Sequence, residues 1–109
     1  MKLFERPIFL IVIALSVLAT SYVKAQEPSE IIKGSILARE VCGGCHAIVA
    51  GEIRSPNPAA PRFEAIARIP GMTAIALNAA LQTSHRTMPN LLLDGEELKN
   101  IVAYILSLK

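Results

Sequence analysis

The sequence has few large aromatic side chains and few residues that bind metals. Its 109 residues contain no tryptophan, three phenylalanines and two tyrosines. The only cysteines are Cys42 and Cys45, and the only histidines are His46 and His85. A chain of this length is expected to form one domain. A site with four cysteine or histidine ligands would have to use all four of these side chains.

The apolar residues, 52% of the chain, are concentrated near its N-terminus. Lys2 and Arg6 precede an apolar run over residues 8–18. Residues 23–25 then provide the small or modest side chains that a signal peptidase recognises before its cleavage site. The run is shorter than the roughly 20 residues that span a membrane. We therefore expect residues 1–25 to be a cleaved signal peptide that directs export to the periplasm, with a retained membrane anchor as the alternative.

The remaining domain, residues 26–109, lacks an excess of either charge. Acidic and basic residues are equal in number from Gln26 onward, so the formal charge of +2 comes from the signal segment. Without a basic surface, neither nucleic acid nor an anionic membrane is an expected partner of the mature chain.

The mature domain also lacks the large rings that usually fill a small core. Only Phe63 and Tyr104 are aromatic after the signal segment. Because a domain of this size buries a limited share of its surface, such a core is marginal by itself. We therefore expect a bulky apolar group to occupy the centre.

The mature chain shows no alternation of apolar and polar residues that would predict strands. Ser29 is a favourable N-cap for a first helix that extends through Val41. Glycine and three prolines then predict a long loop over residues 47–61. A short helix is expected over residues 62–69, and Thr73 can cap the next one.

The last predicted helix has the clearest signals. Asp94 and Glu97 form a capping-box pattern. Five apolar residues then recur at helical spacing, which predicts one buried face: Leu98, Ile101, Val102, Ile105 and Leu106. The predicted fold class is all-α, with about four helices and long loops.

The most informative motif is Cys42-Gly43-Gly44-Cys45-His46. Two thiols at this spacing can form thioether bonds to the two vinyl groups of one haem, and the following imidazole can then bind the iron. The two glycines allow the backbone to lie close to the ring. The motif predicts one covalently attached haem c.

Three other interpretations of the cysteines remain. A thiol–disulfide oxidoreductase uses Cys-x-x-Cys on a βαβ scaffold, for which the chain has no strand pattern. Cys42, Cys45, His46 and His85 could bind zinc, although the spacing differs from that of structural zinc sites. A plain disulfide would close almost no loop and would stabilise the chain little.

With this motif near the start and Met88-Pro89 before the final helix, the chain resembles the class I c-type cytochromes. The resemblance runs from about Glu30 to Leu108 and implies a cytochrome c-like fold wrapped around one haem. It implies that Gly34 meets Tyr104 where the first and last helices cross.

The resemblance also assigns the residues around the iron. His46 and Met88 would be the axial ligands, and the Pro61 carbonyl would accept a hydrogen bond from His46. His85, Met72 or an open position are the alternatives to Met88. Ala38 and the absence of tryptophan depart from the family pattern, and Arg62 and Arg68 are candidate partners of the haem propionates.

A haem with two protein ligands exchanges electrons and does not readily bind small molecules. We therefore expect a monomeric electron carrier, not an enzyme, whose partners are redox proteins such as a dehydrogenase or a terminal oxidase. The alternatives are a haem subunit of a periplasmic dehydrogenase complex, or a haem protein that binds ligands or catalyses a reaction.

Overall fold

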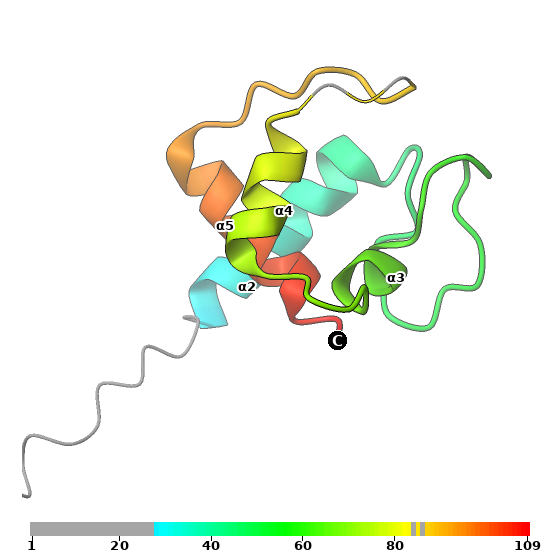
Figure 1. Cartoon of the computed structure of the whole chain (residues 1–109), viewed down its shortest axis with the longest axis horizontal. Helices are drawn as coiled ribbons and strands as arrows, with labels where there is room; N and C mark the ends of the chain where they lie inside the picture. Colours follow the sequence, from blue (N-terminus) through cyan, green and yellow to red (C-terminus); the bar gives the residue numbers. More distant parts are fainter. Residues whose placement is uncertain (1–27, 84, 86) are drawn as a thin grey trace, which may run out of the picture.

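The computed structural model describes residues 28–109 except Ser84 and Arg86, and the expected signal peptide lies outside the described residues. The chain forms helix α2 (Pro28–Leu37), the π-helix η1 (Ala38–Cys42), α3 (Phe63–Ala67), α4 (Ala74–Leu81) and α5 (Gly95–Leu106) (Figure 1). No strand occurs in this described part. The all-α prediction is confirmed, and no described helix is long and apolar enough to cross a membrane.

The first helix differs from the sequence prediction at both ends. Ser29 lies inside α2 and is not its N-cap. Proline suits the first turn of a helix because its φ is fixed near the helical value and it lacks an N–H, so Pro28 is accommodated there. At the other end α2 passes into η1, where the Gly43 N–H donates to the Ala38 carbonyl at 2.8 Å.

Helices α3 and α4 begin close to the predicted positions. The Thr73 hydroxyl accepts from the Ala76 N–H at 3.2 Å, which confirms the predicted cap of α4. Helix α3 is shorter than the predicted range and ends before Ile69. Ile69 precedes Pro70, and the proline ring disfavours helical backbone in the residue before it.

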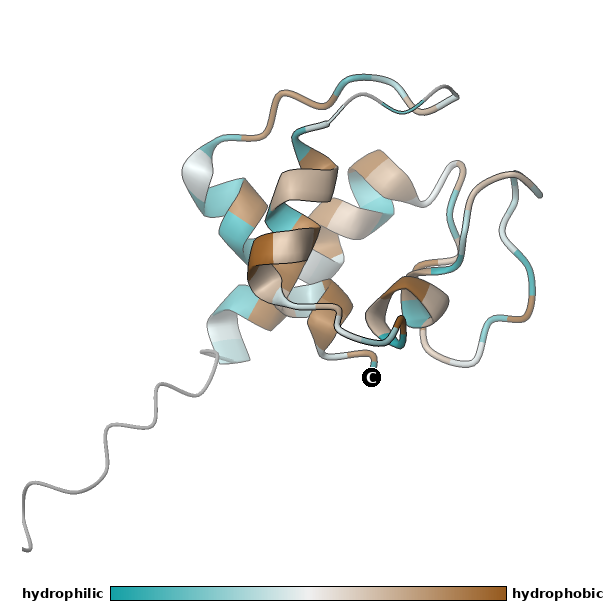
Figure 2. Cartoon of the chain, viewed as in Figure 1, coloured by the Kyte–Doolittle hydropathy of each residue, from teal (hydrophilic) through white to brown (hydrophobic). Residues whose placement is uncertain are grey.

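Helix α5 confirms both sequence signals. Asp94 accepts from the Glu97 N–H at 2.8 Å, and Glu97 accepts from the Asp94 N–H at 3.0 Å, which completes the capping box. Figure 2 shows the polar start and the apolar end of this helix. The predicted apolar face is buried or packed against the core, and Ile101 and Ile105 are the largest fully buried side chains of the described residues.

The most extensive helix contact joins α2 to α5, which also packs against α3 and α4. Gly34 lies at the crossing, where a Cβ atom would be 2.0 Å from the Asn100 carbonyl oxygen and 2.7 Å from the Tyr104 Cβ. The expected contact of Gly34 with Tyr104 is therefore present. Only a residue without a side chain allows the two helices to lie this close.

Ala38, the first residue of η1, is completely buried and belongs to the hydrophobic core. Two ion pairs flank the crossing, Lys33 with Glu96 at 2.8 Å and Lys99 with Glu30 at 2.5 Å. The lysine side chains are largely exposed, so these pairs add little stability. The close backbone approach at Gly34 is therefore a more important contact between α2 and α5 than these ion pairs.

We expect Gly34→Ala to destabilise the protein by about 1–3 kcal/mol, because the added methyl group overpacks the helix crossing. Urea denaturation followed by circular dichroism measures the loss. Gly95→Ala is the matched control, since a Cβ at this helical position meets no atom within 4 Å. Equal stability of the two variants would show that the crossing can relax without cost.

Candidate functional site

A tight turn places Cys42, Cys45 and His46 at the end of the first helical segment. The π-helix η1 ends at Cys42, whose carbonyl accepts from the Cys45 N–H at 3.1 Å and from the His46 N–H at 2.9 Å. Both cysteines are free thiols, and Cys42 is buried while Cys45 is exposed. Because π-turns often occur at functional sites, this departure from α-geometry marks the motif structurally as well as in sequence.

His46 is held in one orientation by a backbone carbonyl. The imidazole is 8% exposed, and its Nδ1 lies 2.6 Å from the Pro61 oxygen. A carbonyl oxygen can only accept, so Nδ1 carries the proton and Nε2 keeps the lone pair that binds a metal. The Phe63 ring packs against the imidazole with ring centroids 5.3 Å apart. The contact with Pro61 is the one that the resemblance implied.

The loop between His46 and α3 is fastened to the motif by further hydrogen bonds. The Ala47 N–H donates to the Ser55 hydroxyl at 2.9 Å, and the Asn57 N–H donates to the Cys45 carbonyl at 3.0 Å. The Phe63 N–H donates to the Ala47 carbonyl at 2.9 Å. Neither Ser55 nor Asn57 was expected at the site from the sequence. The only signal for either was an asparagine between two prolines, which favours a turn.

Tyr104 connects this segment to the last helix. Its hydroxyl donates to the Ile48 carbonyl at 2.7 Å, and its side chain is buried beside Gly34. Burial raises the pKa of the Tyr104 phenol, so the neutral donor is favoured. One side chain therefore joins α2, α5 and the residues that directly follow His46.

The environment of Cys42 argues against thiol–disulfide exchange. Burial raises the pKa of this thiol to about 11, so it stays protonated at neutral pH. Cysteines that exchange disulfides have a lowered pKa because the thiolate is the attacking species. The all-helical described part of the chain also lacks the βαβ scaffold of such enzymes.

The candidate sixth ligands differ in their surroundings. Met88 is half-buried and His85 is exposed, and both lie on the loop over residues 82–94. Met72 packs against the hydrophobic core. Leu92 on the same loop is 97% exposed. Unlike Met72, Met88 is not packed against the core, and it lies on the loop that directly precedes α5.

The described residues contain no preassembled zinc site. Within the residues that the structure describes, no three His, Cys, Asp or Glu side chains gather in a cluster that could bind a metal ion. Cys42, Cys45, His46 and His85 therefore do not form the four-ligand arrangement that a structural zinc ion requires.

The two arginines considered for haem propionates both interact with the protein itself. The Arg62 guanidinium donates to the Glu52 carbonyl at 2.9 Å, and Arg68 pairs with Glu64 at 2.9 Å. The Arg62 contact attaches the loop between His46 and α3 to the start of α3, whereas the Arg68 ion pair joins the C-cap of α3 to its first turn.

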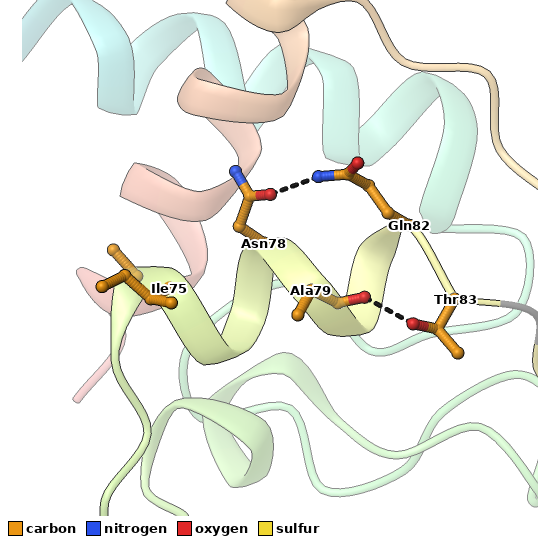
Figure 3. Close-up of a pocket in the computed structure, with 6 residues that line it drawn as sticks. Ile75, Asn78, Ala79, Gln82 and Thr83 are labelled. Carbon is orange, nitrogen blue, oxygen red and sulfur yellow. Dashed lines mark hydrogen bonds between the residues drawn. The ribbon is translucent and has the colours of Figure 1, made fainter.

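A shallow hollow of about 700 Å³ lies along the exposed face of α4 (Figure 3). Within it Asn78 accepts a hydrogen bond from Gln82, and the Thr83 hydroxyl donates to the Ala79 carbonyl at 2.7 Å. The largest apolar side chain lining it is Ile75, which is almost fully exposed. Since its polar side chains already bond to each other or to the helix, the hollow offers few groups to orient a ligand.

The donor set at the motif fits haem c. It comprises two free thiols separated by two glycines, followed by an oriented imidazole with Nε2 as its metal-binding nitrogen. A Cβ on Gly44 would meet no atom within 4 Å, so the turn between the thiols is open. Comparison with known families, curated proteins and solved structures finds no match to this chain.

We expect Tyr104→Phe to lower the free energy of unfolding by about 1–2 kcal/mol, because the buried Ile48 carbonyl loses its donor. Urea denaturation at neutral pH measures this. Ser107→Ala is the control on the same helix: it removes a bond to the Tyr104 carbonyl, which still accepts from the Ser107 N–H. Equal losses in both variants would contradict a special role of the phenol.

The same phenol predicts an alkaline effect. Since the pKa is raised in the folded state, the Tyr104 contribution is complete below the ordinary value of about 10 and is lost as pH rises through the raised value. Tyr104→Phe should lack this part of the alkaline decline.

Proposed function

We propose that this chain is a class I c-type cytochrome with a cytochrome c-like fold, which transfers single electrons between periplasmic redox proteins. The observation that carries the proposal is the oriented His46, whose Nδ1 is bonded to Pro61 directly after the cysteine pair. This arrangement leaves Nε2 available to bind a metal, and the two free thiols directly precede His46 in the sequence.

Cys42 and Cys45 would attach the haem. Each sulfur would add to one vinyl group, forming a carbon–sulfur bond while the thiol proton goes to the neighbouring carbon, so no oxidant would be needed. The free thiols of both residues suit this addition. The glycines between them allow a close approach of the backbone.

His46 and Met88 would be the two protein ligands of the iron. The hydrogen bond to Pro61 fixes the imidazole and increases its basicity, as partners of metal-bound histidines generally do. A thioether ligand favours ferrous iron and raises the reduction potential. With both ligands supplied by protein, the haem would supply reversible one-electron exchange and not ligand chemistry.

The surface around the motif supports brief apolar docking. Gly44 and Cys45 are exposed, and Val41 and Val49 on either side of the motif are exposed as well. The mature sequence has no net charge to steer a partner. A dehydrogenase or a terminal oxidase would therefore contact the chain, as a monomer, through a small and weak interface.

Covalent haem is the first test. Intact mass after periplasmic expression should show one haem added to a chain that begins at Gln26, and acid acetone should not extract the haem. Cys45→Ala should leave a single thioether bond. A mature protein without haem would refute the proposed function, and a chain that keeps residues 1–25 would favour the anchor.

The sixth ligand is the second test. Met88→Ala should lower the reduction potential, open the iron to carbon monoxide and abolish the weak red-edge absorption of sulfur-ligated ferric haem. His85→Ala is the matched control from the same loop and should retain that band. Loss of the band in the His85 variant alone would reverse the assignment. Carbon monoxide binding to the unmodified reduced protein would favour a ligand-binding haem instead of an electron carrier.

A further inference from the structure

Glu64 on α3 bridges two parts of the structure with one carboxylate. Its Oε2 accepts from the Gly51 N–H at 3.0 Å, and its Oε1 pairs with Arg68 at 2.9 Å. The Glu64 side chain is 17% exposed, whereas the Arg68 side chain is 62% exposed. Gly51 is exposed as well, so both contacts of the carboxylate lie at the protein surface.

The Gly51 contact fastens a turn of the loop between His46 and α3. Gly51 adopts a φ of +82°, a conformation that side chains disfavour. Glu52 closes this turn by accepting from the Val49 N–H at 3.0 Å, and the Arg62 guanidinium donates to the Glu52 carbonyl at 2.9 Å. Residues 49–52 are thus attached to the beginning of α3 by both Glu64 and Arg62.

The loop attached in this way has the iron-ligand candidate at one end. His46 begins it and Pro61 ends it, and these two residues are joined by the short hydrogen bond at Nδ1. Phe63, which packs on the imidazole, directly precedes Glu64 in α3. A displacement of this turn relative to α3 would therefore strain the Pro61–His46 bond.

We infer that Glu64 is a positioning residue for His46: by fixing the turn over residues 49–52 on α3, it keeps the Pro61 carbonyl on the imidazole. The contacts stand independently of any cofactor, but the consequence for an iron ligand rests on the proposed function. Glu64 itself would touch neither haem nor substrate.

The charges around Glu64 keep it ionised. Its pKa is lowered first by the hydrogen bond from the Gly51 N–H and then by Arg68 and Arg62, the C-cap and N-cap residues of α3. Because the pKa is lowered in the folded state, the attachment is complete above the ordinary value of about 4.5. It is lost as pH falls through the lowered value.

Three variants of the haem-loaded protein separate the roles of the carboxylate. Glu64→Ala removes both contacts. Glu64→Gln keeps an acceptor oxygen for Gly51 but removes the charge. Arg68→Gln is the matched control, since it breaks only the exposed i,i+4 ion pair and leaves the Gly51 contact in place.

Two measurements report on His46 rather than on general stability. In Glu64→Ala we expect the His46 Nδ1 proton to exchange with solvent about tenfold faster, as measured by NMR. The reason is that the charge-assisted bond between Glu64 and the Gly51 N–H, which resists local opening of the turn, is lost. The reduction potential should rise, because a weaker bond to Pro61 makes the imidazole less basic. Glu64→Gln should lie between Glu64→Ala and the wild type, and Arg68→Gln should match the wild type.

A pH titration of the potential supplies a third arm that does not depend on the folding of Glu64→Ala. Below about pH 4.5 the wild type should acquire a change in potential that Glu64→Gln lacks. Equal potentials and exchange rates in Glu64→Gln, Arg68→Gln and wild type, with equal pH profiles, would overturn the inference. Wild-type protein without covalent haem would instead refute the proposed function, so the two failures are distinguishable.

Discussion

The close crossing of α2 and α5 at Gly34 is the constraint on which the rest of the structure depends. No side chain fits between Gly34 and the Asn100 carbonyl, so the backbones of the first and last helices are in direct contact. Tyr104 lies in the same contact and reaches the Ile48 carbonyl with its hydroxyl. The helix pair therefore also fixes the segment that follows His46. A packing interaction between the terminal helices thus determines where the candidate site lies.

The second organising feature is the dense hydrogen bonding of the loop after the motif. A segment without helix or strand must satisfy its backbone groups in other ways, and here Ser55, Glu52 and Glu64 accept from N–H groups of the loop. These bonds keep the Pro61 carbonyl in place against the His46 imidazole. Rigidity around the imidazole suits an electron carrier, because a ligand set that moves little between oxidation states exchanges electrons with little reorganisation.

The elements that sequence reasoning predicted well are those with strictly local causes. The cap of Asp94 and Glu97 and the cap of Thr73 depend on residues within three positions, and both are present. The prediction that Ser29 caps the first helix was wrong because Pro28 is equally compatible with the first turn. The π-helix before Gly43 left no recognisable signal. Helix boundaries and local irregularities depend on small energy differences that a one-dimensional pattern does not contain.

The sequence by itself determined the helical class, the apolar face of α5 and the motif over residues 42–46, because each is encoded by spacing along the chain. It also suggested that Gly34 and Pro61 have special roles, through a resemblance. Only the tertiary structure decided that Pro61, among the three prolines of its loop, binds His46, and that Glu64 secures the turn at Gly51. Those contacts join residues more than ten positions apart, and their geometry follows from how the helices pack and not from local preference.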